Sequence, residues 1–155
     1  MTADEKRVLH ATGVRLAGLG VLITGPSGSG KSLLALDLLD QFSLRGADAL
    51  LVADDGVEIA AEAGALAMAA PDSIAGLIEL RGRGIVPLPH VARARVDLVV
   101  DLVETLERMP EDAAFATTLA GVVVTRCPVP HRRDTDPVHQ RLLVLAGLRA
   151  VGWPG

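Results

Sequence analysis

A glycine-rich octapeptide, set between an apolar run and an amphipathic stretch, constrains the fold of this chain more than any other feature. It fills every fixed position of the pattern G-x-x-x-x-G-K-[ST], the Walker A motif. Its residues are Gly25, Pro26, Ser27, Gly28, Ser29, Gly30, Lys31 and Ser32. Glycines allow such a loop to curl so that its N–H groups point at a phosphate, and the helix that follows adds the positive end of its dipole. The motif predicts a nucleoside triphosphate site, in which Lys31 neutralises phosphate charge and the Ser32 hydroxyl binds Mg²⁺.

The residues on either side of the motif have the periodicity that a phosphate-binding loop requires. Residues 20–25 are an apolar run that predicts a buried strand. Between Lys31 and Gly46, apolar residues recur with the spacing i, i+3, i+4, i+7, which predicts a helix of about three turns. A second apolar run, 47–53, predicts the next strand. The motif thus stands in the order strand, glycine loop, helix, strand.

The remaining chain predicts mainly strands, with one helix near the end. Apolar runs and turn residues mark the segments. The expected segments are one or two strands within 8–19, a hairpin over 57–68, a strand over 96–106 whose tail becomes helical, a strand over 119–125, a loop over 127–137 and a helix over 137–148.

Length and composition favour a single α/β domain spanning 1–155. A chain of 155 residues fits one domain, because domains most often have about 100–150 residues. Half of the residues are apolar, which excludes a disordered chain and favours a sheet covered on both faces. No apolar run reaches the roughly 18–20 residues that a membrane span requires, and the charged start lacks a signal-peptide core. We therefore expect a cytoplasmic protein that does not bind membranes.

Charge and aromatic content argue against nucleic-acid binding. Fifteen basic and nineteen acidic residues give a net charge of −4, the wrong sign for a protein that neutralises phosphate backbones. One Trp, two Phe and no Tyr leave almost no aromatic side chains on which bases could stack. The single cysteine, Cys127, excludes an intramolecular disulfide and a cysteine-rich zinc site, and it fits a reducing compartment.

Acidic residues beyond the second strand are candidates for catalysis. Asp54 and Asp55 stand where a carboxylate could reach a metal ion or an incoming hydroxyl. Adjacent side chains of a strand point in opposite directions, so we expect one of the pair to face the site and the other the scaffold. Glu79 lies in an otherwise apolar run, and its spacing fits a site residue and an outward-facing strand residue equally well. His10, from its sequence position alone, fits a surface or capping histidine.

Four blocks of the sequence resemble the C-terminal kinase domain of bacterial HPr kinase/phosphorylase. They are residues 10–13 (HATG), 20–32 (GVLITGPSGSGKS), 51–55 (LVADD) and 77–85 (LIELRGRGI). The blocks span roughly the first half of the chain, and the last is the most specific, because ordinary P-loop kinases lack it. The similarity is to the short α-proteobacterial form, which has no N-terminal domain. It implies an α/β fold, a P-loop kinase core like that of phosphoenolpyruvate carboxykinase and HPr kinase, with a mixed sheet and flanking helices.

The resemblance also implies a function and assigns roles to residues. In that family, ATP phosphorylates a serine of HPr, a small phosphocarrier of a phosphotransferase system, and phosphorolysis can reverse the reaction. By resemblance, the octapeptide holds ATP, Ser32 and Glu79 bind Mg²⁺, and Asp55 is the catalytic acid/base. His10 and Lys31 are implied as further active-site residues. An HPr-type protein is the implied partner, and a homo-oligomer, usually a hexamer, is the implied assembly.

The chain departs from the family pattern after Leu88. The family's Pro-Val-x-Pro-Gly-Arg-Asn loop is represented only by residues 128–134 (PVPHRRD), which lack the glycine. Either Arg132 or Arg133 could replace the missing arginine, and Arg108 is a candidate for an upstream catalytic arginine. Phosphorolysis must hold two anionic groups close together, which demands added positive charge. We therefore expect the kinase direction to be retained better than phosphorolysis.

Two other functions remain open from the sequence. Arg81, Arg83, Arg93 and Arg95 are compatible with the lid and acceptor pocket of a small-molecule kinase. A nucleotide-binding regulatory module without turnover would result if the altered loop had removed catalysis. Incubation with HPr and with candidate metabolites would separate the two kinases.

Overall fold

The computed structural model describes residues 6–155, which form twelve strands and two α-helices. The strands are β1 (Arg7–Leu9), β2 (Thr12–Leu16), β3 (Leu19–Thr24), β4 (Ala49–Ala53), β5 (Val57–Glu62), β6 (Ala65–Ala69), β7 (Leu77–Leu80), β8 (Gly84–Pro87), β9 (Arg93–Arg95), β10 (Leu98–Val103), β11 (Ala116–Leu119) and β12 (Val122–Pro130). The α-helices are α1 (Lys31–Leu44) and α2 (Pro137–Ala150), and short 3-10 helices are η1 (Asp72–Ile74), η2 (Asp112–Phe115) and η3 (Arg132–Asp134).

A mixed sheet of six strands, in the order β11-β12-β10-β3-β2-β4, is the centre of the molecule. Strand β10 pairs in parallel with both β3 and β12, whereas β2 pairs antiparallel with both β3 and β4. Strands β3, β4, β10 and β12 therefore point the same way, and their carboxyl ends meet at one edge. Ligands of open α/β sheets bind outside the carboxyl ends of the strands, so this edge is where the fold positions a site.

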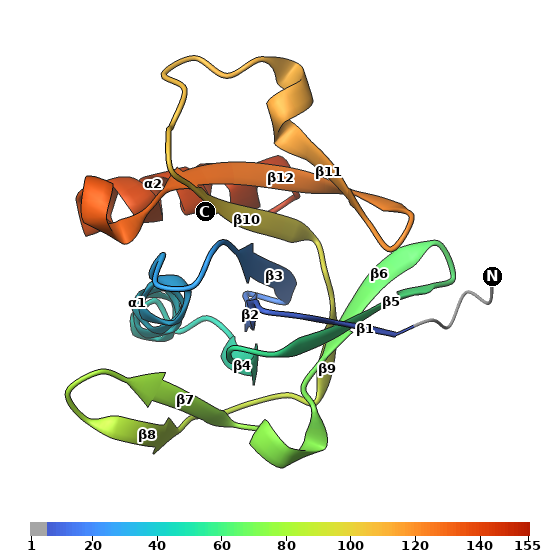
Figure 1. Cartoon of the computed structure of the whole chain (residues 1–155), viewed down its shortest axis with the longest axis vertical. Coiled ribbons are helices and arrows are strands. Elements are labelled where there is room, and N and C mark those ends of the chain that lie inside the picture. The colour runs from blue at the N-terminus through green and yellow to red at the C-terminus, as the bar shows by residue number, and fades with distance from the viewer. Residues whose placement is uncertain (1–5) are drawn as a thin grey trace.

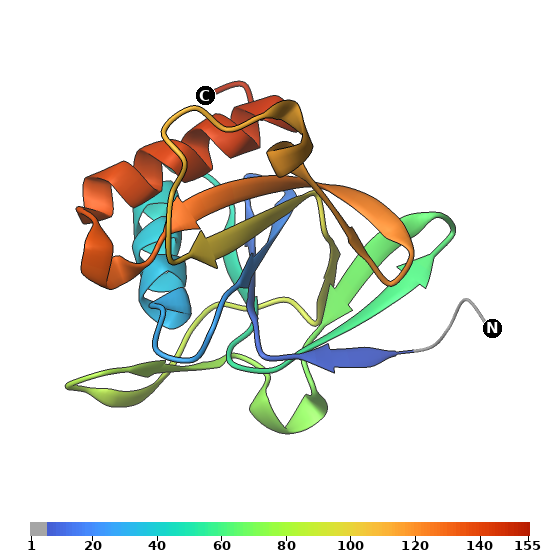
Figure 2. The ribbon, with the colours of Figure 1, turned by 45° about the horizontal axis from the view of Figure 1, so that its top comes forward.

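Different layers cover the two faces of the central sheet (Figures 1 and 2). Both α1 and α2 cover one face, and an ion pair between Arg141 and Asp37 joins them at 2.8 Å. The hairpin β5–β6 covers the other face as part of a second sheet, ordered β1-β5-β6-β9. The prediction of a sheet covered on both faces is confirmed. Both helices lie on one face of this sheet, because the chain after β4 continues as hairpins instead of a second crossover helix.

Alternate residues of the buried strands serve separate cores. In β3, Val21 and Ile23 pack beneath the helices, and Leu22 between them packs against the second sheet. Strand β10 repeats the arrangement, with Val100 on the helix side and Val99 on the other. Strands buried on both faces must be apolar throughout, which is why they read as continuous apolar runs in the sequence.

Most of the predicted elements are present, but several of the predicted boundaries are wrong. The strand before the motif, helix α1, strand β4, the hairpin β5–β6 and helix α2 are confirmed. The expected helical tail of 96–106 is absent, because β10 ends at Val103 and the chain continues in bends. The expected loop 127–137 begins late, since β12 continues to Pro130. Beyond Thr125, β12 has no β11 partner, so its prolines lie where proline is tolerated in a strand.

The apolar run 114–124 folds back on itself. Strands β11 and β12 form an antiparallel hairpin around Ala120 and Gly121, whose φ angles are 49° and 76°. Two successive residues with positive φ give the turn that suits the twist of a two-residue hairpin. The strand predicted over 119–125 is thus interrupted by this turn. In the part of the chain that the structure describes, no helix is long and apolar enough to cross a membrane.

Candidate active site

The Walker A loop leaves β3 at the carboxyl edge of the sheet and enters α1. Gly25 and Gly30 have φ angles of 152° and 97°, which other residues rarely adopt. A β-carbon on Gly25 would lie 2.8 Å from Ser29 Oγ, and one on Gly30 would lie 2.7 Å from Arg132 Cβ. Both positions therefore require glycine for space as well as conformation. Gly30 is the N-cap of α1 and gives no side-chain cap, so the first N–H groups of the helix remain available to an anion.

Lys31 reaches back across the same loop. Its Nζ donates hydrogen bonds to the carbonyl oxygens of Gly25, at 2.9 Å, and Pro26, at 3.0 Å. The residue is only 8% exposed. A phosphate in the loop would offer charged oxygens in place of these carbonyls, and charge-assisted hydrogen bonds are the stronger kind. The ammonium group is thus held where the motif predicts that it acts.

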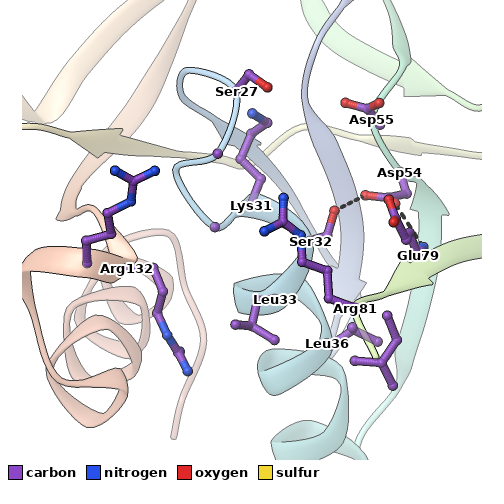
Figure 3. Close-up of a pocket in the computed structure, with 14 residues that line it drawn as sticks. Ser27, Lys31, Ser32, Leu33, Leu36, Asp54, Asp55, Glu79, Arg81 and Arg132 are labelled. Atoms are coloured by element: carbon purple, nitrogen blue, oxygen red, sulfur yellow. Dashed lines mark hydrogen bonds between the residues drawn. The ribbon is translucent and has the colours of Figure 1, made fainter. Parts of the chain in front are cut away.

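An open pocket of about 440 Å³ lies in front of the loop (Figure 3). Ser27, Gly28, Gly30, Lys31 and Ser32 of the motif line it. Three acidic residues line it from the strand side, and two leucines of α1 add an apolar wall. These residues are Asp54, Asp55, Glu79, Leu33 and Leu36. Sequence-predicted residues from three separate segments are therefore brought to one cavity.

Asp54 follows the last residue of β4 and faces the motif. Its Oδ1 accepts hydrogen bonds from Ser32 Oγ, at 2.6 Å, and from Thr12 Oγ1, at 3.0 Å. Its Oδ2 accepts a 3.3 Å bond from the backbone N–H of Glu79 (Figure 3). One carboxylate thus ties the Walker A serine to β2 and β7. Asp54 is the member of the acidic pair that faces Ser32.

Asp55 is exposed and stands beside His10. Its side chain is 81% exposed, that of His10 is 92% exposed, and His10 Nδ1 lies 4.0 Å from Asp55 Oδ1. The expectation that one member of the acidic pair points into the scaffold is wrong. Asp55 has a φ of 58°, which ends the strand, so the alternation of strand side chains no longer applies to it. His10 does not line the 440 Å³ pocket but a neighbouring hollow, which also contains Thr24 and Arg126.

Oxygen groups suited to Mg²⁺ line the pocket around Ser32. The Ser32 hydroxyl is hydrogen-bonded to Asp54, and the exposed side chain of Glu79, on β7, lines the same pocket. Within residues 6–155, no three His, Cys, Asp or Glu side chains are grouped as a complete metal site. Mg²⁺ usually takes one or two carboxylates plus phosphate oxygens and waters, so the donors present fit Mg²⁺ carried by a nucleotide.

Arginines border the pocket on two sides. Arg81, which follows β7, lines it, as do Arg132 and Arg133 in η3. Arg108, the other arginine proposed from the sequence, is exposed and is not part of the lining. The structure thus brings the segment 131–134 to the Walker A loop although the two are about a hundred residues apart in the chain.

A further acidic residue at the carboxyl edge, Asp101, was not identified from the sequence. Asp101 of β10 lies in register with Thr24 of β3 and accepts a 3.0 Å hydrogen bond from its hydroxyl. Arg126 donates two bonds to Asp101 Oδ2, from Nε at 3.0 Å and from Nη2 at 2.7 Å, and a third to the carbonyl oxygen of Ala114. This cluster braces the strand that leads into the motif. An acidic residue inside an apolar strand, LVVDLV, is the signal that could have identified it.

Cys127 is structural, as the sequence indicates. Its thiol donates to the carbonyl oxygen of Leu143 at 3.2 Å. Burial raises the pKa of the Cys127 thiol to about 11, while the nearby Arg126 lowers it slightly. A thiol with this pKa stays protonated near neutral pH, so Cys127 is no nucleophile.

Comparison with known proteins agrees with this geometry. The family described as HPr Serine kinase C-terminal domain matches residues 2–136. The chain belongs to that family. It is 33% identical over 156 residues to HPr kinase/phosphorylase of Lacticaseibacillus casei (strain BL23), covering 96% of this chain and 47% of the relative. It is 44% identical over 143 residues to HPr kinase/phosphorylase of Clostridium acetobutylicum, covering 88% of this chain and 44% of the relative.

A solved structure resembles the whole fold. It is the Hpr(Ser) kinase/phosphatase from Coxiella burnetii, with a TM-score of 0.72 and 28% identity, covering 96% of this chain and 99% of that one. The chain spans about half the length of the curated relatives that it matches. The predicted α/β fold of the HPr kinase type, with a mixed central sheet, is therefore confirmed.

Proposed function

We propose that this chain is an ATP-dependent protein-serine kinase that phosphorylates an HPr-type phosphocarrier protein. The observation that carries the proposal is the 2.6 Å hydrogen bond between Ser32 of a complete Walker A motif and Asp54, in a pocket shared with Asp55 and Glu79. Membership of the HPr Serine kinase C-terminal domain family supports the choice of acceptor. Two relatives named HPr kinase/phosphorylase support it as well.

The Walker A loop would bind the triphosphate of ATP. The loop offers backbone N–H groups, the open N-terminus of α1 and the Lys31 ammonium, and all three attract phosphate oxygens. Lys31 would exchange its bonds to the Gly25 and Pro26 carbonyls for bonds to phosphate oxygens. Because phosphoryl transfer depends mainly on positioning and charge stabilisation, these groups would supply most of the catalysis.

Asp55 would act as the acid/base. In the kinase direction it would take the proton of the seryl hydroxyl while the serine oxygen bonds to the γ-phosphorus. The bond from that phosphorus to the bridging oxygen breaks, and ADP leaves with the electron pair. The exposed Asp55 carboxylate is free to accept this proton, whereas Asp54 already accepts three hydrogen bonds. His10, 4.0 Å from Asp55, would orient that carboxylate or the incoming serine.

Ser32 and Glu79 would hold Mg²⁺, with Asp54 orienting the Ser32 hydroxyl. When bound, Mg²⁺ neutralises charge on the β- and γ-phosphate oxygens. The backbone bond from Glu79 to Asp54 fixes β7 against β4, so the carboxylate of Glu79 is presented to the pocket by a strand instead of a free loop. Such support favours a precisely placed site.

The decisive experiment measures the transfer of labelled γ-phosphate from ATP to HPr purified from the same organism as this chain. We expect acid-stable phosphoserine on wild-type HPr and none on HPr in which the acceptor serine is replaced by alanine. Lys31→Ala is the matched control on the enzyme side. Transfer to a metabolite but not to HPr would favour the small-molecule kinase, and nucleotide binding without any transfer would favour the regulatory module.

The reverse reaction should be slower in this chain. In phosphorolysis an oxygen of inorganic phosphate attacks phosphoserine, the serine oxygen leaves with a proton from Asp55, and pyrophosphate forms. The segment 131–134 keeps two arginines but lacks the glycine of the family loop. Phospho-HPr plus phosphate should therefore yield pyrophosphate slowly under conditions in which ATP phosphorylates HPr readily. Equal rates in both directions would show that the missing glycine is unimportant.

We further propose that the chain acts as a homo-oligomer in the cytoplasm, where ATP is plentiful and the lone Cys127 remains reduced. Exposed apolar side chains support an oligomer: Val8 is 67% exposed, Met109 86% and Val123 72%. The family resemblance favours a hexamer. Light scattering at working concentration tests the assembly, and a monomeric mass would rule it out.

A further inference from the structure

We propose that Arg133 supplies a cation to the β–γ end of the bound triphosphate, and that Arg132 beside it is a packing residue. The sequence left open which of the two serves the site. The inference rests on the proposed nucleotide site but not on the identity of the acceptor. It concerns the surface where η3 meets the Walker A loop, on the side of the pocket opposite the acidic residues (Figure 3).

Backbone hydrogen bonds fix the segment 131–134 against the neighbouring elements. The N–H of His131 donates to the carbonyl oxygen of Val103 at 3.1 Å, at the end of β10. The N–H of Arg132 donates to the carbonyl oxygen of Ser29 at 3.2 Å, within the Walker A loop itself. The segment is therefore attached directly to the phosphate-binding loop, and its two arginine side chains project from a defined backbone.

Arg132 packs on the loop through its stem. The Cβ, Cγ and Cα of Arg132 lie 2.7, 3.4 and 3.9 Å from the position that a β-carbon on Gly30 would occupy. No atom of its guanidinium is among these near neighbours. The aliphatic part of Arg132 therefore fills the space that glycine leaves at the start of α1, a role that any residue with the same stem could perform.

Arg133 approaches the loop with its charged end. Its Nη2 lies 3.9 Å from the position that a β-carbon on Gly28 would occupy, and the side chain lines the pocket. No carboxylate of residues 6–155 forms an ion pair with Arg133, whereas Arg126 is paired with Asp101 and Arg141 with Asp37. Within the described residues, no carboxylate thus competes with a bound phosphate for the guanidinium of Arg133 beside the loop.

A free guanidinium in this place suits the chemistry of phosphoryl transfer. Negative charge accumulates on the oxygens around the γ-phosphorus as the bond to the leaving group breaks. Arginine binds phosphate oxygens with two parallel N–H groups, and an arginine provided by the same chain stabilises that charge in other P-loop enzymes. ATP brings a γ-phosphate that ADP lacks, so contact with Arg133 should distinguish the two nucleotides.

The test compares three variants with the wild type by calorimetry with MgATP and with MgADP, without an acceptor. Arg133→Gln should weaken MgATP binding by about tenfold and leave MgADP binding within about threefold. Arg132→Gln is the matched control, because glutamine keeps Cβ and Cγ, and both affinities should stay within about threefold. Arg133→Lys, which keeps a charge without the paired donors, should fall between the wild type and Arg133→Gln.

The outcomes separate this inference from the proposed function. If the wild type binds MgATP and Arg133→Gln binds it equally well, the assignment of Arg133 is wrong, whatever acceptor the enzyme uses. A larger loss in Arg132→Gln would reverse the two roles. If the wild type binds neither nucleotide, the proposed function fails first and this inference with it. With an acceptor in hand, Arg133→Gln should lower kcat by about a hundredfold or more while KM for the acceptor is unchanged.

Discussion

The two α-helices have the same length, fourteen residues each, but their first turns are built in opposite ways. Helix α2 begins at Pro137, which has no N–H to satisfy, and the Asp136 side chain accepts a 2.8 Å hydrogen bond from the N–H of Val138. Helix α1 begins at Lys31 behind Gly30, which provides no side-chain cap, and its first turn contains no acidic residue. One helix start is satisfied internally, and the other is left open.

The difference separates a helix start that serves stability from one that can bind. Open N–H groups at a helix start cost stability unless water, a side chain or a ligand satisfies them. In α1 they face a pocket whose loop also holds Lys31, so an anion would complete the helix. In α2 the carboxylate of Asp136 already takes that place. The contrast predicts that substitutions near α1 alter activity more than stability, and that those near α2 do the reverse.

The largest expected effect is that of Lys31→Ala, at the first position of α1. The substitution removes the cation that the loop holds beside the phosphates, and we expect turnover to fall by about 10³-fold or more, with weaker ATP binding. Phosphate transfer and nucleotide titration measure the two effects. Lys6→Ala, at an exposed position, is the control. Unchanged turnover in Lys31→Ala would show that neither the loop nor the open start of α1 takes part in catalysis.

Asp55→Asn should follow, with a loss of about 10²–10⁴-fold in kcat and little change in nucleotide affinity, because an amide cannot accept the seryl proton. Asp54→Asn should lose less, since an amide oxygen can still accept the bond from Ser32 Oγ. Single-turnover rates of the two variants measure the difference. If Asp54→Asn were slower than Asp55→Asn, we would assign the acid/base role to Asp54, which faces the start of α1.

Glu79→Gln tests whether the site beside the open start of α1 also binds Mg²⁺. A neutral amide is a poorer ligand for a hard cation, so half-maximal activity should require roughly three- to tenfold more Mg²⁺. Glu62→Gln is the control, because Glu62 pairs with Arg93 outside the pocket. If the Mg²⁺ titration were unshifted, Glu79 would be an outward-facing strand residue and no ligand of Mg²⁺. The open start of α1 would then bind the nucleotide without help from Glu79.

The same contrast explains what the sequence could predict. The Walker A loop was predictable because its positive φ angles and close contacts require glycine at fixed positions. These glycines form a pattern that can be recognised in the sequence. The start of α2 was predictable for a similar reason, since Asp136 and Pro137 form a local capping signal. The high apolar content and the continuous apolar runs likewise predicted a sheet covered on both faces.

The rest of the site depends on contacts between distant segments. The pairing of Arg126 with Asp101 requires β12 to lie beside β10, which no local pattern indicates. Pairing of β12 with β10 also extends β12 to Pro130, through prolines that by themselves favour a loop. The role of Arg133 follows from where the chain after β12 meets the Walker A loop, a contact that spans about a hundred residues. These features depend on strand register and on packing between distant segments, so residue type alone could not predict them.

The smallest expected effect lies at the capped helix. Asp136→Ala removes the acceptor for the N–H of Val138, and loss of such a cap costs about 1 kcal/mol of the free energy of unfolding. Asp136→Asn should retain the cap within a few tenths, because the two residues are nearly equal at this position. For a domain of this size the alanine variant should unfold about 2–4 °C lower, while kcat stays within about twofold of the wild type. Thermal unfolding and a transfer assay on the same samples measure both. A large loss of kcat with an unchanged unfolding temperature would mean that the start of α2, next to η3, belongs to the site, and the division between the two helix starts would no longer hold.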